Sequence, residues 1–143
     1  MNMKYISLMV AAAAIVASLS CSKNKDDKPI EGRWSSMVWV TESGKRCSIA
    51  NVPAAGGELT FFCRNYPSPW ISSAKLNGKY YYPNEEANDY WTITVDWFKA
   101  EINDNKLTVV VEANDTGEER LVEELAITAG DIFYTFKFKQ SAN

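Results

Sequence analysis

Histidine is absent from the 143 residues of this sequence. It is the side chain most often used for acid–base catalysis near neutral pH, and it is the commonest metal ligand. Its absence leaves carboxylate chemistry open but argues against an enzyme before any motif is considered. The Asp- and Asn-containing turns at 103–105 and 114–115 carry too few ligands for a calcium loop. The sequence therefore predicts neither a metal nor a cofactor.

An excess of positive charge is also missing. The formal net charge is −3 and the isoelectric point is about 5.0, so the chain offers no broad basic surface and nucleic acid is not an expected partner. Hydrophobic residues make up 46% of the sequence, aromatic residues 13% and charged residues 23%. This composition is typical of one folded domain with a substantial core.

Long apolar runs are confined to the amino terminus. Residues 1–20 contain one basic residue, Lys4, then an alanine-rich apolar run that ends in small residues. This is the anatomy of a signal peptide. The run is too short, and is followed too soon by polar residues, to predict a membrane-spanning helix.

Cysteine is scarce, and one of the three cysteines lies directly after this apolar run. Cys21 follows Leu19 and Ser20, which resembles the lipobox of bacterial lipoproteins. The family prefers leucine at the place of Ser18, and looser forms of this kind resemble those of Bacteroidetes-type bacteria. The resemblance implies that the Cys21 thiol is acylated after cleavage and anchors the protein stably to a membrane.

A charged tract follows the cysteine. Residues 22–27 resemble the export signal that sends such lipoproteins to the outer cell surface, which implies an outer-membrane, surface-exposed location. The alternative is that the tract is only a solvated tether, and both can hold together. We expect residues 21–31 to form the lipidated cysteine and its flexible tether.

Assigning Cys21 to lipid leaves Cys47 and Cys63 as an even pair in an oxidising compartment. Residues 47–52 and 59–63 read as two strands of a hairpin around 53–57. In that register Cys47 faces Cys63, so a cross-strand disulfide is plausible. Two buried free thiols are the alternative, because a slip of one residue separates the pair.

From Gly32 onward the pattern is one of strands. Apolar and polar residues alternate in the segments 91–97, 106–112, 121–128 and 132–139, which is typical of sheets with one face on a core. Trp91 and Trp97 fall on inward faces, whereas Trp39 and Phe133 fall on outward faces, where they would form an apolar patch for a partner. Short strands at this spacing predict an all-β, antiparallel β-sandwich over residues 32–143.

Three stretches, 54–61, 111–120 and 138–142, together resemble the BACON domain, an immunoglobulin-like β-sandwich of surface and periplasmic proteins of Bacteroidetes. The matching residues, in the order that the family shows, are Gly56, Gly57, Trp91, Trp97, Asn114, Gly117, Arg120 and Gln140. The Arg120 side chain is expected to reach the carbonyls of the turn before it. The family name implies carbohydrate binding, although members are also regarded as spacers, and no family motif transfers a sugar contact to a particular residue.

The segment at about 64–90 departs from the family as an insertion, and function often resides in such additions. It is rich in aromatic, amide and carboxylate side chains, a composition typical of sugar-binding surfaces. The residues that we expect to contact carbohydrate are Tyr66, Trp70, Tyr80, Tyr81, Tyr82, Asn84, Glu85 and Asp89. The alternative is that Trp70 and one or two of the tyrosines cover the end of the core.

The sequence thus predicts a non-catalytic, cell-surface lipoprotein that binds carbohydrate. The alternative is a spacer or adhesion module that contacts other surface proteins and has no affinity for sugar. The carboxylates Glu85, Glu86, Asp89 and Asp96 are the only catalytic candidates, and a glycosidase needs two of them at a defined separation in a cleft. No catalytic residue is predicted.

Overall fold

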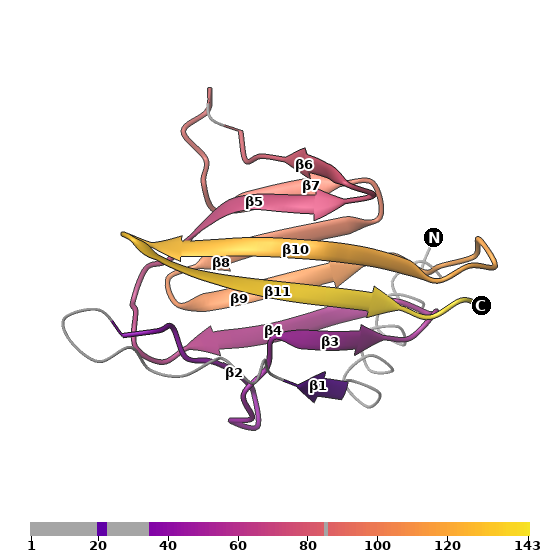
Figure 1. Ribbon diagram of the computed structural model, residues 1–143, viewed down its shortest axis with the longest axis horizontal. Coiled ribbons are helices and arrows are strands. Elements are labelled where there is room, and N and C mark those ends of the chain that lie inside the picture. The colour runs from indigo at the N-terminus through magenta and orange to yellow at the C-terminus, as the bar shows by residue number, and fades with distance from the viewer. Residues whose placement is uncertain (1–19, 23–34, 85) are drawn as a thin grey trace, which may run out of the picture.

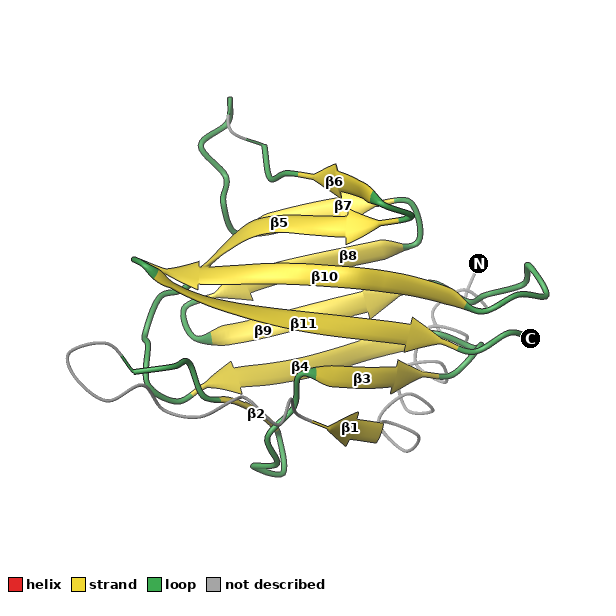
Figure 2. Ribbon diagram, in the orientation of Figure 1, coloured by secondary structure: helices red, strands yellow, loops and turns green. Residues whose placement is uncertain are grey.

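The computed structural model describes residues 20–22, 35–84 and 86–143. All regular elements in these ranges are strands, as Figure 2 shows. They are β1 (Ser20–Ser22), β2 (Trp39–Thr41), β3 (Ile49–Val52), β4 (Gly57–Cys63), β5 (Trp70–Leu76), β6 (Lys79–Tyr81), β7 (Thr92–Val95), β8 (Phe98–Asn103), β9 (Lys106–Val111), β10 (Arg120–Ala129) and β11 (Ile132–Gln140). Within these ranges no helix is long and apolar enough to cross a membrane.

The strands form two sheets that pack face to face (Figure 1). One sheet has the order β1-β3-β11-β10-β5-β6, and the other has the order β2-β4-β9-β8-β7. The predicted all-β sandwich is confirmed. Its sheets are not wholly antiparallel, because β3 pairs with β11 in parallel. Most of the predicted signal peptide (1–20) and most of the predicted tether (21–31) lie outside the described residues. The part that is described, Ser20–Ser22, forms strand β1.

The core lies between the two sheets and is rich in aromatic rings. On β11 the side chains of Tyr134, Phe136 and Phe138 point inward, and the Phe136 ring lies 5.0 Å from the ring of Phe61 on β4. Phe133 on the same strand is 64% exposed. The alternation that the sequence predicts for β11, including an outward Phe133, is therefore confirmed.

The predicted hairpin of residues 47–52 and 59–63 is wrong. β3 belongs to the six-stranded sheet and β4 to the five-stranded sheet, so residues 53–56 cross from one sheet to the other. β3 takes β11 as a partner, and β4 takes β9 and β2. Apolar alternation fixes which face of a strand is buried, but it does not identify the neighbouring strand.

The predicted Cys47–Cys63 disulfide is not formed, because Cys47 lies just before β3 of one sheet and Cys63 ends β4 of the other. Cys47 is instead bonded to Cys21, and Cys63 is a buried free thiol. The pairing of β1 with β3, which places Cys21 opposite Ala50, brings the Cys21 thiol to Cys47.

Two tryptophans lie on the opposite side from the one predicted. Trp39 is fully buried, because β2 begins only at this residue and pairs it with Cys63 on the inner face of β4. Trp91 is 44% exposed, because it precedes β7 and its backbone amide is held by the Asp89 carboxylate. Trp97 is half-buried and packs against the core.

The segment at 64–90 is part of the sandwich as well as a loop. β5 pairs with β10 along most of its length, and β6 pairs with β5 at the edge of the sheet. Trp70, Tyr80 and Tyr81, the aromatic residues of these two strands, are therefore positioned by strand register.

Candidate functional site

The exposed side of the six-stranded sheet, which we call the outer face, faces the viewer in Figure 1. Paired residues on neighbouring strands point to the same side of a sheet. The outer face therefore includes three neighbouring rows of side chains contributed by β6, β5, β10 and β11: an aromatic row, a middle row and a charged row.

The aromatic row joins Trp70, Thr128 and Phe133. Trp70 on β5 pairs with Thr128 on β10, and Thr128 pairs with Phe133 on β11. The backbone positions of Trp70 and Phe133 are therefore two strand spacings apart, about 10 Å. Thr128 between them is fixed, because its hydroxyl donates to the backbone oxygens of Gly130 and Ile132, 3.1 Å from each.

The middle row carries small side chains. Ala126 on β10 pairs with Ser73 on β5 and with Thr135 on β11. Tyr82, which is 63% exposed, follows the end of β6 beside this row. Small side chains here leave the backbone of the sheet accessible to a flat ligand between the two rows of larger side chains.

The charged row joins Tyr80, Lys75 and Glu124. Lys75 on β5 pairs with Tyr80 on β6 and with Glu124 on β10, and its ammonium lies 5.3 Å from the centre of the Tyr80 ring. A β-bulge between Val122 and Leu125 brings the carboxylates of both Glu123 and Glu124 to within 4.0 Å of Lys75. The carboxylates also accept hydrogen bonds within the protein: Glu123 from the backbone amide of Gly78 at 2.6 Å, and Glu124 from the Tyr80 hydroxyl at 3.4 Å. The charged row is therefore a connected network at the surface of the sheet.

The three rows combine the groups that recognise a sugar. Aromatic rings can pack against the C–H face of a pyranose, while hydroxyl, ammonium and carboxylate groups hydrogen-bond its hydroxyls. Trp70 and Phe133 supply rings at one side of the outer face, and Tyr80 supplies one at the other. Ser73 and Thr135 supply hydroxyls between them.

The other predicted contact residues do not join this arrangement. Tyr81 turns toward the core, opposite Ala74. Asn84 and Asp89 stabilise their own loop, because Asn84 accepts hydrogen bonds from the backbone amides of Ala87 and Asp89 at 3.2 and 3.0 Å. Glu85 lies outside the described residues.

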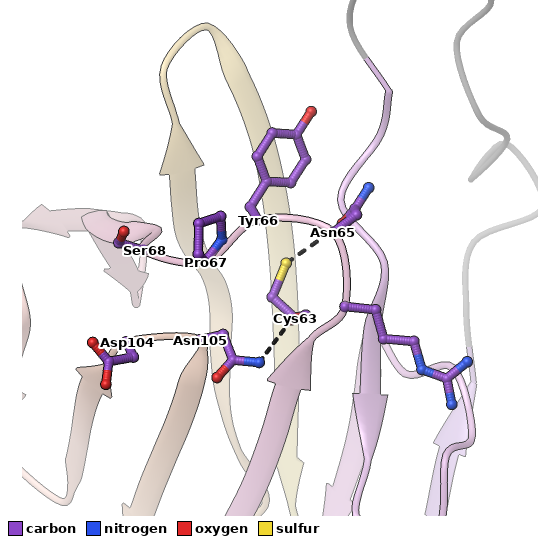
Figure 3. A pocket seen from close by; sticks show the side chains of 8 residues that line it. Cys63, Asn65, Tyr66, Pro67, Ser68, Asp104 and Asn105 are labelled. Carbon is purple, nitrogen blue, oxygen red and sulfur yellow. Dashed lines mark hydrogen bonds between the residues drawn. The ribbon is translucent and has the colours of Figure 1, made fainter.

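Tyr66 lies apart from the outer face, in an open hollow of about 540 Å³ at one end of the sandwich (Figure 3). The hollow is lined by Cys63, Arg64, Asn65, Tyr66, Pro67, Ser68, Asp104 and Asn105. The Tyr66 hydroxyl donates to the backbone oxygen of Ser35. Its polar tip is therefore engaged within the protein.

The amides in this hollow also serve the fold. Asn65 donates to the backbone oxygen of Ser36 at 2.7 Å and accepts from the amide of Val38 at 2.9 Å. Asn105 donates to the backbone oxygen of Cys63 at 2.9 Å (Figure 3). Burial raises the pKa of the Cys63 thiol above its ordinary value, so Cys63 is not an activated nucleophile.

A solved structure resembles this one: an NMR structure of a protein from Bacteroides thetaiotaomicron, with 32% sequence identity and a TM-score of 0.66. The similarity covers 87% of this chain and 98% of that chain. The chain belongs to the family of this Bacteroides protein. No protein-family profile matches the chain, and no curated protein matches it either.

The sequence predicted that Trp70, Tyr80 and Tyr82 belong to the candidate site. It did not predict which residues of other strands lie next to them. Phe133 was predicted to point outward, and only the register of β10 between β5 and β11 places it level with Trp70. Glu124 was not predicted, because the β-bulge that turns it toward Lys75 has no signature in the sequence.

Proposed function

We propose that the protein is a non-catalytic, cell-surface lipoprotein of the BACON type that binds glycan on its outer face. The arrangement of Trp70 and Phe133 on either side of Thr128 carries this proposal. The two rings, on backbone positions about 10 Å apart, would pack against separate residues of an extended glycan that crosses the strands. Ser73, Thr135 and the charged row would hydrogen-bond the hydroxyls along one edge of that glycan.

The BACON assignment is supported by the way its matching residues meet. Arg120 donates hydrogen bonds to the backbone oxygens of Glu112 and Ala113 at 3.0 and 3.1 Å, as the resemblance implied. Gln140 accepts a hydrogen bond from Arg120, and Gly56 packs against the same turn. Residues that are far apart in the sequence thus form one structural unit, which gives the sequence pattern a physical basis.

The lipid anchor is supported by the signal-like residues 1–20 and by Cys21 directly after them. A family relative from Bacteroides fits the loose lipobox, in which Ser18 stands at the usual leucine position. Such an anchor would hold the sandwich at the outer membrane, where it would meet glycans and other surface proteins.

The non-catalytic part of the proposal rests on the surroundings of the carboxylates. Glu123 and Glu124 lie on an open sheet face and pair with Lys75. A glycosidase instead needs two carboxyl groups on opposite sides of the scissile bond.

The test is a glycan array, followed by affinity measurements on the best ligand. The protein is unacylated residues 21–143, which keep both Cys21 and Cys47. We expect Trp70→Ala and Phe133→Ala each to weaken binding at least tenfold, about 1.4 kcal/mol, because each removes a ring that the glycan covers.

Two variants serve as matched controls. Trp91→Ala removes an exposed aromatic ring beside the other sheet, and Tyr66→Ala removes one from the end hollow. Both should bind glycan as the parent does. If only Tyr66→Ala loses glycan binding, the binding site is the end hollow and not the outer face. If the parent binds no glycan on the array, the protein is a spacer or adhesion module and does not recognise carbohydrate.

A further inference from the structure

In the folded sandwich Cys21 is joined to Cys47 by a disulfide. β1 adds to the edge of β3, so that Ser20, Cys21 and Ser22 pair with Asn51, Ala50 and Ile49. The Cα atoms of Cys21 and Cys47 are 5.1 Å apart, within the range of disulfides. Cys47 is fully buried, so Cys21 is the thiol placed to reach it.

A lipid thioether at Cys21 would consume the same sulfur that forms this disulfide. A thioether does not take part in thiol–disulfide exchange, whereas a disulfide sulfur carries no thiol for the acyl-glyceryl group. The two modifications are therefore mutually exclusive on one molecule.

We infer that Cys47 competes with the lipid for Cys21, so that oxidation before acylation yields a disulfide-bonded form without an anchor. This inference rests on the lipid anchor of the proposed function. The oxidation needs a donor disulfide of the thiol–disulfide oxidoreductase class. Two exchange steps transfer the bond: Cys47 and Cys21 each lose a proton, their sulfurs become joined, and the donor leaves as two thiols.

Cys47 is suited to either outcome. Its sulfur lies 3.8 Å from the backbone oxygen of Ile49, which can accept a hydrogen bond from the free thiol. Buried free cysteine behaves as a small apolar side chain. Acylation of Cys21 would therefore leave Cys47 inside the core as a stable, unreactive thiol.

The competition is tested on the full 143-residue chain, produced in a bacterium that has the lipoprotein-acylating enzymes. Intact-mass measurement and detergent phase partition give the acylated fraction, and non-reducing thiol counting gives the disulfide fraction. We expect a disulfide-bonded, unacylated population in the parent, and we expect Cys47→Ala to reduce the unacylated population several-fold. Cys63→Ala is the matched control, because Cys63 is also buried but does not contact Cys21.

A second measurement guards against misfolding of Cys47→Ala. When cells that produce the protein without substitutions are grown with a membrane-permeant thiol reductant, the acylated fraction of the protein should rise in the same way. If the parent is fully acylated and has no disulfide, and neither Cys47→Ala nor the reductant changes this, the inferred competition is wrong. The lipid anchor of the proposed function would then be correct. If the parent is disulfide-bonded and no variant or growth condition gives any acylated protein, the proposed lipid anchor is wrong, and the inferred competition is wrong with it.

Discussion

The guanidinium of Arg120 donates a hydrogen bond to the side-chain oxygen of Gln140, with Nε and Oε1 2.7 Å apart. Arg120 also lies over the Trp97 ring, 4.4 Å from its centre. The amide nitrogen of Gln140 in turn donates to the backbone oxygen of Glu112 at 2.8 Å and contacts that of Pro53 at 3.2 Å. One buried amide therefore joins the end of β11, the turn after β9 and the crossing between the sheets.

Replacing Gln140 with leucine should lower the free energy of unfolding by about 2 to 3 kcal/mol. Leucine has a similar volume, but it removes the acceptor of the Arg120 Nε and one of the donors to the backbone oxygens of Glu112 and Pro53. Denaturant unfolding of residues 21–143 measures the effect. Lys139→Ala, an exposed neighbour on the same strand, should change stability by less than about 0.5 kcal/mol. Equal effects of the two changes would refute the role of the Gln140 amide.

Gly56 occupies a position that no other residue fits. Its φ is +71°, and a Cβ there would lie 2.3 Å from the backbone oxygen of Val111. Gly56→Ala should therefore cost about 3 kcal/mol, from the left-handed backbone and from the forced shift of β9. Gly130→Ala is the matched control: its φ is +62°, and no atom lies within 4 Å of the added Cβ.

The control should cost only about 1 kcal/mol. Thermal or denaturant unfolding of both variants separates two costs of adding a Cβ: the cost of the left-handed backbone, which both variants have, and the cost of the clash with β9, which only Gly56→Ala has. If Gly130→Ala proved as damaging as Gly56→Ala, the contact with β9 would not be what excludes a side chain at Gly56.

The middle row of the outer face offers a test that removes no aromatic ring. Ala126→Arg places a long side chain between the aromatic and charged rows, so it should reduce glycan affinity at least tenfold with little change in stability. Val110→Arg adds the same side chain to the exposed side of β9 in the other sheet. Affinity and unfolding are measured for both, and full glycan affinity in Ala126→Arg would place the ligand elsewhere.

Much of the fold could be predicted from apolar alternation. A strand with one face on the core and the other in water has apolar and polar residues in alternation, and this pattern is visible in the sequence. β8 and β9 around Asp104 and Asn105, and the last hairpin of β10 and β11, form as the sequence predicted. β3 and β4 each show the predicted strand character, yet they enter different sheets. Their partners β11 and β9 lie more than 40 residues later, and alternation does not encode partners so distant in the chain.

The candidate site was predicted less completely for the same reason. The aromatic content of 64–90 was visible, but the neighbours of Trp70 are fixed by its register with Thr128. Tyr66 was grouped with Trp70 from the sequence because both lie in the segment 64–90. Trp70 is the first residue of β5, whereas Tyr66 lies in the loop before that strand and lines the end hollow.

The buried thiol of Cys63 predicts a specific response to alkaline pH. Burial raises the pKa of Cys63 in the folded state above its ordinary value of 9.0, so the folded protein keeps the proton that the unfolded chain releases. Its contribution to stability is thus fully present below about pH 9 and is lost as the pH rises through the folded-state pKa. Denaturant unfolding of residues 21–143 should show the parent losing stability relative to Cys63→Ala as the pH rises above about 9. Tyrosines and lysines also titrate in this pH range, but both proteins contain them, so their effects cancel in the comparison. If the free energies of unfolding of the two proteins change with pH in parallel, the Cys63 thiol is not shielded in the folded protein.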